Sequence, residues 1–286
     1  TISVKHPQVR DFIRIKRNLT RVTGANISVR LTDDFMEAVR DGEEFTLQWP
    51  VDSSNPDVTS TVNAQDLWHE IIESAHACAE PGLLFWDNAK TRTPSDIYES
   101  EGFGSVSTNP CGEIILSPYD SCRLMLVNLK SFVTNAFSPE ASFDYKKMSE
   151  VVQKAQRLMD DMIDLEVEQV DRILEKIEND PEPDAVKRIE KEMWETVKSQ
   201  AVRGRRTGLG VTAIGDAIAA LGIRYGSEES IRTVETIYKC LTLNAYKSSC
   251  ILAKERGSFP VYDAQKEEGH PYLTQLFLAD DELSVL

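Results

Sequence analysis

The chain has 286 residues, enough for one large domain or two small ones, and 41% of them are hydrophobic, so it can bury a sizeable core. Its 47 acidic and 32 basic residues give a net charge of −15, which argues against sequence-independent binding of nucleic acid. We see neither an apolar run of membrane-spanning length nor a secretion leader. Five cysteines make no disulfide framework. A reduced, cytoplasmic protein is expected.

Helices and strands alternate in the first half of the chain. Apolar residues at helical spacing predict helices over 7–16, 33–39 and 64–79. Alternating or β-branched runs predict strands over 26–31 and 45–49, and a buried strand over 83–86. Residues 51–63 are rich in Ser, Asn, Asp and Thr, and we expect a surface excursion there.

Helices dominate from residue 145 onward. Asp144 is expected to cap a first helix, and Ser227 to cap the longest helix, which ends at Gly257. Between them, apolar stripes on either side of a Pro-Glu-Pro break at 181–183 predict a helical hairpin over 165–202. We expect its stripes to pack on each other: Val167, Val170, Leu174 and Ile177 against Val186, Ile189, Met193 and Val197. The fold class is therefore α/β, with a helix-rich second half.

The outer faces of this hairpin are highly charged, which is typical of a solvent-exposed decoration. Replacing residues 166–201 by a short linker is expected to leave the rest folded. The main alternative is that the hairpin forms a dimer contact.

Chemistry-bearing side chains gather in the segment 105–116. Asn109, Cys111 and Glu113 are two residues apart, and in an extended chain alternate side chains face the same side. An amide, a thiol and a carboxylate would then converge on one small volume, and Gly112 would allow close approach of a ligand. A turn with a buried cysteine is the competing interpretation, and spacing alone leaves both open.

The run Asn-Pro-Cys-Gly-Glu at 109–113, followed by an apolar strand, closely resembles the active-site finger loop of the ribonucleotide reductase catalytic chain. Further motifs resemble the same family in the same order, at 6–13, 26–29, 32–36, 81–85 and 205–210. The resemblance covers the chain except about 165–202. It implies that residues 1–286 form part of a ten-stranded α/β catalytic barrel, with the hairpin inserted in it.

The resemblance also implies roles for individual residues. Cys111 matches the cysteine that becomes a thiyl radical and takes hydrogen from the ribose 3′ carbon. Glu113 matches the general base on the 3′ hydroxyl, and Asn109 the amide that orients the substrate hydroxyls, with Ser107 and Thr108 also in substrate binding. Cys122 matches one cysteine of the pair that supplies reducing equivalents by becoming a disulfide.

The separation of 11 residues between Cys111 and Cys122 resembles the adenosylcobalamin-dependent class II enzymes more than class I. A class I chain, which needs a separate radical-generating subunit, is the first alternative. The second is a catalytically silent interaction module of the same fold, with the acidic hairpin as its working surface.

By the same resemblance, the partners are a ribonucleotide substrate, a thioredoxin-like reductant and allosteric nucleotides, which bind through regions outside these residues. A homodimer is a further option. The partner cysteine is expected before Thr1 and the substrate-phosphate loop after Leu286, so the chain is interpreted as the middle of a reductase. We predict no metal site, because no cysteines have Cys-x-x-Cys spacing. The basic patch of Arg203, Arg205 and Arg206 is open to two interpretations, a nucleotide-phosphate contact or a solvated helix start.

Overall fold

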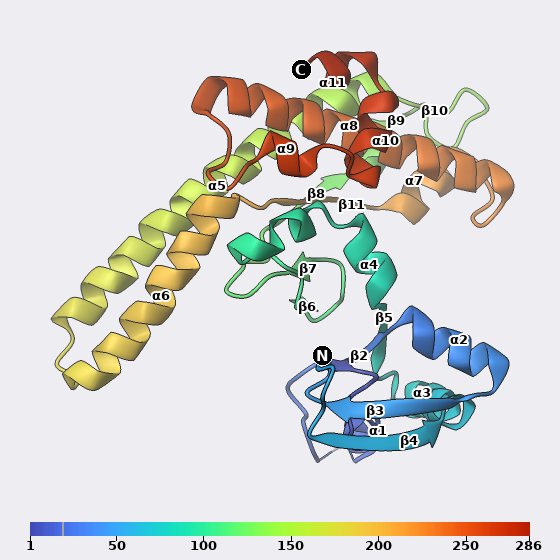
Figure 1. Ribbon diagram of the computed structural model, residues 1–286. Coiled ribbons are helices and arrows are strands. Elements are labelled where there is room, and N and C mark those ends of the chain that lie inside the picture. The colour runs from blue at the N-terminus through green and yellow to red at the C-terminus, as the bar shows by residue number, and fades with distance from the viewer. Residues whose placement is uncertain (19) are drawn as a thin grey trace. The chain divides into compact units, whose positions relative to one another are not determined.

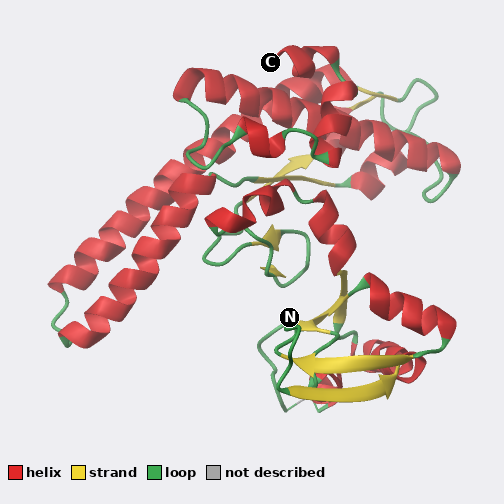
Figure 2. Ribbon diagram, viewed as in Figure 1, coloured by secondary structure: helices red, strands yellow, loops and turns green. Residues whose placement is uncertain are grey.

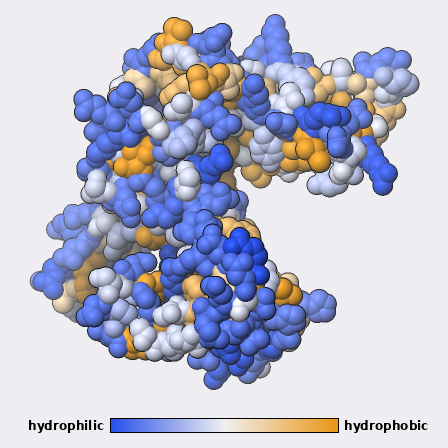
Figure 3. Space-filling view, turned by 45° about the vertical axis from the view of Figure 1, so that its right-hand side comes forward, coloured by the Kyte–Doolittle hydropathy of each residue, from blue (hydrophilic) through white to orange (hydrophobic). Residues whose placement is uncertain are grey.

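The computed structural model describes residues 1–18 and 20–286, which form two compact units, Thr1–Ser117 and Pro118–Leu286. Figure 1 shows the helices and strands in chain order, and Figure 2 shows how helix-rich the second unit is. Figure 3 shows that hydrophilic residues cover most of the visible face, with separate hydrophobic patches between them. No described helix is both long and apolar enough to cross a membrane.

A parallel sheet forms the centre of the first unit. Its order is β1-β2-β5, with the strands β1 (Ile2–Ser3), β2 (Ser28–Leu31) and β5 (Gly82–Phe85). Three helices accompany it: α1 (Val9–Arg14), which continues into a 3-10 turn η1 (Ile15–Arg17), α2 (Asp33–Asp41) and α3 (Ala64–Cys78). Val29, Leu31, Phe35, Leu67 and Ile71 are fully or almost fully buried in one cluster. The predicted strand 26–31 and the helices that begin near residues 7, 33 and 64 are thus confirmed.

The surface excursion expected over 51–63 contains a strand. Strand β4 (Val58–Asn63) pairs antiparallel with β3 (Glu44–Trp49), and Phe45 lies opposite Val62. The β-branched run Val-Thr-Ser-Thr-Val is a strand signal. Most of β4 is exposed to solvent, which is why its polar composition looks like that of a loop.

Strand β5 forms as predicted, but it is not buried. Phe85 is 51% exposed and Leu83 is also on the surface. The strand lies at the edge of its three-stranded sheet, where it pairs with β2. After it, α4 (Trp86–Arg92) and the 3-10 segment η2 (Pro94–Glu101) lead to the short strands β6 (Ser107–Thr108) and β7 (Ile115–Leu116).

The second unit contains a parallel pair of strands with a long helical connection. Strand β8 (Leu124–Asn128) pairs with β11 (Gly208–Thr212), and Leu124 lies opposite Gly208. The connection holds η3 (Leu129–Phe132), the antiparallel strands β9 (Val133–Thr134) and β10 (Ser142–Phe143), and the helices α5 (Tyr145–Asn179) and α6 (Asp184–Gly204). The helices α7 (Ile214–Ala220), α8 (Glu228–Arg256), α9 (Ala264–Glu267), α10 (Pro271–Leu278) and α11 (Asp281–Val285) follow.

Helix α5 is one continuous helix of 35 residues, so it, and not the 29-residue α8, is the longest. Both predicted caps are present, because Asp144 accepts a hydrogen bond from the Lys147 amide and Ser227 accepts one from the Ser230 amide. The stripe Met148, Val152, Met159 and Ile163 on α5 is completely buried. Ile231 and Tyr238, in the first half of α8, are exposed.

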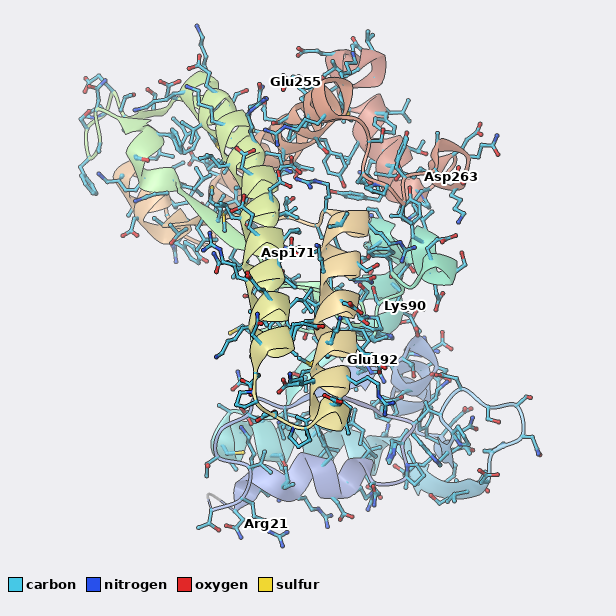
Figure 4. The ribbon with its side chains drawn as sticks, turned by 90° about the vertical axis from the view of Figure 1, so that its left-hand side faces the viewer. Arg21, Lys90, Asp171, Glu192, Glu255 and Asp263 are labelled. Atoms are coloured by element: carbon cyan, nitrogen blue, oxygen red, sulfur yellow. The ribbon has the colours of Figure 1, made fainter. Side chains whose placement is uncertain are left out.

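Helices α5 and α6 run antiparallel across the break at 180–183 (Figure 4). The expected packing of stripe on stripe is wrong for α6, because Ile189 is 65% exposed and Met193 is also exposed. Ion pairs join the helices instead, from Lys198 to Asp171 and from Lys191 Nζ to Glu178 Oε2 at 3.2 Å. Val170 and Ile177 on α5 are nevertheless buried.

A denser ion network closes the base of the hairpin. Arg205 follows α6 with a left-handed backbone (φ 43°), and its guanidinium pairs with Asp160 Oδ1 and Asp164 Oδ1, both at 2.7 Å. Arg256 on α8 pairs with Asp160 Oδ2 and Asp161 Oδ1, also at 2.7 Å. Burial opposes ionisation of Asp160, but the two arginines outweigh it and hold the pKa of its carboxyl below the usual value.

These contacts predict where the hairpin can be cut. Replacing residues 171–198 by about four Gly/Ser residues spans helices packed ~8–10 Å apart and keeps the network at the base. We expect a cooperative thermal transition whose midpoint moves by less than about 4 °C, the shift that ~1 kcal/mol causes in domains of ~150–250 residues. Circular dichroism measures both the transition and the loss of helix.

The matched comparison is the wider deletion of 166–201. It also removes Glu166, whose carboxylate pairs with the buried Arg123, and it should lower the midpoint more than the tip deletion does. Loss of the cooperative transition in the tip deletion would contradict the assignment of 171–198 as a dispensable extension.

Candidate active site

The segment 109–114 is a tight loop between two short antiparallel strands. Ser107 on β6 lies opposite Leu116 on β7. The Gly112 amide donates to the Asn109 carbonyl at 3.1 Å, and the Asn109 amide donates to the Ile114 carbonyl at 3.2 Å. Gly112 has a φ of 85°, which a side-chain-bearing residue rarely adopts. The backbone therefore reverses direction across Pro110 and Cys111.

The extended chain assumed for residues 109–113 is therefore wrong, and so is the argument that alternate side chains share a face. The turn separates the three residues by burial: Asn109 is buried, whereas Cys111 and Glu113 are exposed. The alternative of a buried cysteine in this turn is also wrong, because the Cys111 thiol is free and its residue is exposed.

Asn109 closes the loop with its own side chain. Its Oδ1 accepts a hydrogen bond from the Ile114 amide at 3.0 Å, so the acceptor end of the amide is committed to the backbone. Among residues 1–18 and 20–286 its side-chain NH₂ group makes no hydrogen bond with a protein group, so that end remains for a ligand oxygen. Thr108 Oγ1 donates to the Asn109 carbonyl at 2.9 Å, and Ser107 Oγ lies 3.3 Å from Thr1 Oγ1.

Neighbouring polar groups hold the hairpin in place. Both the amide and the hydroxyl of Ser105 donate to the Asp96 carboxylate, at 2.7 and 2.8 Å. Arg30 on β2 donates from Nη1 to the Val106 carbonyl at 3.2 Å, and its guanidinium lies over the Trp86 ring, 5.0 Å from the centroid. Burial lowers the pKa of Arg30. The loop is thereby fixed to the parallel sheet of its own unit.

Cys122 belongs to the second unit, where it stands two residues before β8 and is exposed. The neighbouring Arg123 is buried and pairs with Glu166 on α5, and Arg206 pairs with the buried carboxylate of Asp120. The basic patch predicted at 203–206 is thus no solvated helix start, because Arg205 and Arg206 follow the end of α6 and pair with carboxylates. Sequence reasoning missed Glu166, since no local signal pairs it with a residue 43 positions away.

In the part of the chain that the structure describes, no three His, Cys, Asp or Glu side chains are grouped so that they could hold a metal ion. The site defined by these residues is an exposed thiol and an exposed carboxylate on a hydrogen-bonded turn, beside a buried amide whose oxygen is bonded to the Ile114 amide. Such a set suits chemistry at a carbon that carries hydroxyl groups, because it combines an atom that can hold an unpaired electron with a base and an orienting donor.

The family profile described as "Ribonucleotide reductase, barrel domain" matches residues 1–277. The chain belongs to this family, and its fold is part of the α/β barrel that the family's name describes.

Curated relatives give the same assignment. The chain is 30% identical over 266 residues to a vitamin B12-dependent ribonucleoside-diphosphate reductase from Thermoplasma acidophilum, covering 91% of this chain and 30% of that protein. It is 31% identical over 263 residues to the enzyme of the same name from Mycobacterium tuberculosis (strain CDC 1551 / Oshkosh), covering 91% of this chain and 33% of that one. The chain therefore spans about a third of the length of these relatives.

The fold is also similar to a solved structure, the alpha subunit of the Actinobacillus ureae class Id ribonucleotide reductase. The TM-score is 0.63 at 20% identity, over 91% of this chain and 41% of that one. At this identity the match is evidence for the fold alone.

The turn predicts the effect of a single methyl group. In Gly112→Ala the new Cβ would meet only Leu84 Cδ2, at the ordinary distance of 3.6 Å, so the cost arises from the positive φ and should be ~1–2 kcal/mol. Urea unfolding measures it. Gly102→Ala, at φ 89° with open space around it, should cost about the same, and Gly24→Ala, also in open space, should cost less than both. A near-neutral Gly112→Ala would contradict the turn.

Proposed function

We propose that this chain carries the radical chemistry of a ribonucleotide reductase, the reduction of ribonucleotides to 2′-deoxyribonucleotides, as one part of a catalytic barrel. The observation that supports it is the exposed Cys111 on the Gly112 turn, next to Glu113 and Asn109, in a chain of the reductase family. We further propose residues 1–286 as a partial barrel domain with the hairpin at 165–202 inserted in it.

Each group on the loop has one task. Cys111, as a thiyl radical, takes the hydrogen from the ribose 3′ carbon and later returns it, and sulfur suits this because it holds an unpaired electron at modest cost. Glu113 accepts the proton of the 3′ hydroxyl. The NH₂ group of Asn109, held by the bond between its Oδ1 and the Ile114 amide, orients the substrate hydroxyls together with Ser107 and Thr108.

The electrons come from a pair of thiols. The 2′ hydroxyl leaves as water, the ribose gains the two electrons, and Cys122 with a partner cysteine becomes a disulfide, so atoms and electrons balance. A thioredoxin-like dithiol then reduces that disulfide. The exposure of Cys122 fits this role. Free thiols also favour a cytoplasmic location.

The radical source is proposed to be adenosylcobalamin, in line with the names of the relatives, which are vitamin B12-dependent reductases. The access to the thiol fits such a source: Cys111 is exposed, as a thiol that meets an external radical source must be. The cofactor, when bound, supplies the radical that removes the hydrogen atom from this thiol. No residue of this chain is assigned to hold it.

The alternatives predict different behaviour in a chain of the relatives' full length that contains these residues. Class I requires a separate radical-generating subunit in place of adenosylcobalamin. A catalytically silent interaction module binds its partner through the hairpin and is indifferent to loss of Cys111. Under both the class I and the class II hypothesis, allosteric nucleotides and a second copy of the chain are further partners.

The decisive experiment uses such a full-length chain. Reduction of a ribonucleoside diphosphate or triphosphate should depend on adenosylcobalamin, and Cys111→Ser should abolish it, because oxygen does not accept the radical easily. The volume change is small, so circular dichroism should be unchanged. Cys250→Ser on α8 is the control and should keep its activity. Turnover of Cys111→Ser within about tenfold of wild type would exclude Cys111 from the chemical step, since tenfold is only ~1.4 kcal/mol.

A second variant separates catalysis from binding. Glu113→Gln keeps the shape but removes the base, so kcat should fall by roughly 10²–10⁴ with nucleotide affinity nearly unchanged. Glu37→Gln, an exposed acid on α2, is the matched control. If affinity fell while the rate at saturation did not, Glu113 would be a binding residue only.

A further inference from the structure

Cys122 stands where two parallel strands begin side by side. Leu124, the first residue of β8, pairs with Gly208, the first residue of β11. The segments that lead into these strands, 120–123 and 205–207, therefore lie next to each other. Two arginines join them: Arg123 Nη1 donates to the Arg206 carbonyl at 3.0 Å, and Arg206 pairs with the Asp120 carboxylate.

The residue after Cys122 is a buried cation. The Arg123 side chain is only 5% exposed, and its charge is opposed by the Glu166 carboxylate on α5. Its Nη2 is buried and has no hydrogen-bond partner among the described residues, so Glu166 and one carbonyl provide its hydrogen-bond acceptors. A buried guanidinium that loses its counter-charge has to move toward solvent, because an uncompensated charge in the interior is strongly disfavoured.

The residue two places before Cys122 is held in the same way. The Asp120 side chain is only 3% exposed and pairs with Arg206, which follows Arg205 in the chain. Arg205 is itself bound to Asp160 and Asp164 on α5. The exposed cysteine thus lies between two buried charged side chains, and both are tied to the base of the α5–α6 hairpin.

We propose that Glu166 and Arg206 are positioning residues for Cys122, acting through Arg123 and Asp120. The proposal rests on the redox role proposed for Cys122 above. Thiol–disulfide exchange requires the attacking sulfur to approach the other sulfur in line, so the position of the thiol sets the rate. The base of the hairpin, where Glu166 lies 44 positions from Cys122 in the sequence, then controls the position of that thiol.

The test is made on the 286-residue chain itself, with iodoacetamide as the probe and peptide mass spectrometry as the readout. In Glu166→Gln the guanidinium of Arg123, next to Cys122, loses its counter-charge. The alkylation rate of Cys122 should then change at least threefold. The rate of Cys111 in the same sample should stay the same. Glu168→Gln, an exposed acid two residues along α5, should leave both rates unchanged, and Glu166→Asp should restore part of the wild-type rate.

A merely structural role for Glu166 gives a different pattern. If the carboxylate only stabilises the unit, then Cys122, Cys240 and Cys250 should all become more reactive together. If Glu166→Gln does not fold, the pair Arg123→Met with Glu166→Leu removes both charges at once, which buried ion pairs often tolerate. The proposal still requires a change at Cys122 alone in that variant. An unchanged Cys122 rate in a folded variant overturns the proposal.

The redox role is tested separately in the full-length reductase. Cys122→Ser should abolish turnover with a dithiol reductant, and Glu166→Gln should lower kcat with the substrate KM unchanged. If Cys122→Ser kept full activity, the redox role would fail even where the alkylation result held. If alkylation of Cys122 did not respond to Glu166→Gln, the positioning role would fail even where Cys122 proved essential.

Discussion

Parallel pairing of strands is the constraint on which both units depend. Two parallel strands cannot be joined by a tight turn, so a long crossover must carry the chain back to the starting edge. Between β2 and β5 the crossover holds α2, the β3–β4 hairpin and α3. Between β8 and β11 it holds α5 and α6. In the second case the return places the beginnings of both strands side by side, and there the charged residues around Cys122 meet.

Local signals in the sequence were enough for most elements. Caps such as Asp144 and Ser227 and the apolar faces of α3 and α5 act within a few residues, so their pattern predicts them directly. Strand β4 was missed because its composition is polar and its pairing with β3 is not visible locally. The prediction that β5 is buried is wrong. Burial depends on the position of the strand in its sheet, and the strand's own residues do not show that position.

For the loop at 109–113, the residue types were informative and the spacing was misleading. Period-two reasoning assumes an extended chain, whereas the Gly112 backbone and the bond from the Ile114 amide to Asn109 Oδ1 close a turn. A glycine three places before an apolar strand is a turn signal as much as a sign of close approach. The turn buries Asn109 and exposes Cys111 and Glu113, whereas an extended strand would place all three side chains on one face.

The distribution of charge explains why α5 extends so far beyond its buried stripe. At its base, carboxylates on α5 pair with the buried Arg123 and the partly buried Arg205, where a missing partner would leave a poorly solvated charge, and with Arg256 at the surface. Toward the tip the pairs are lysine with acid near solvent, where each contributes little. One helix therefore has two parts with different energetics. Its base is bound to the segment that carries Cys122, and its tip is expected to tolerate changes in length without disturbing that segment.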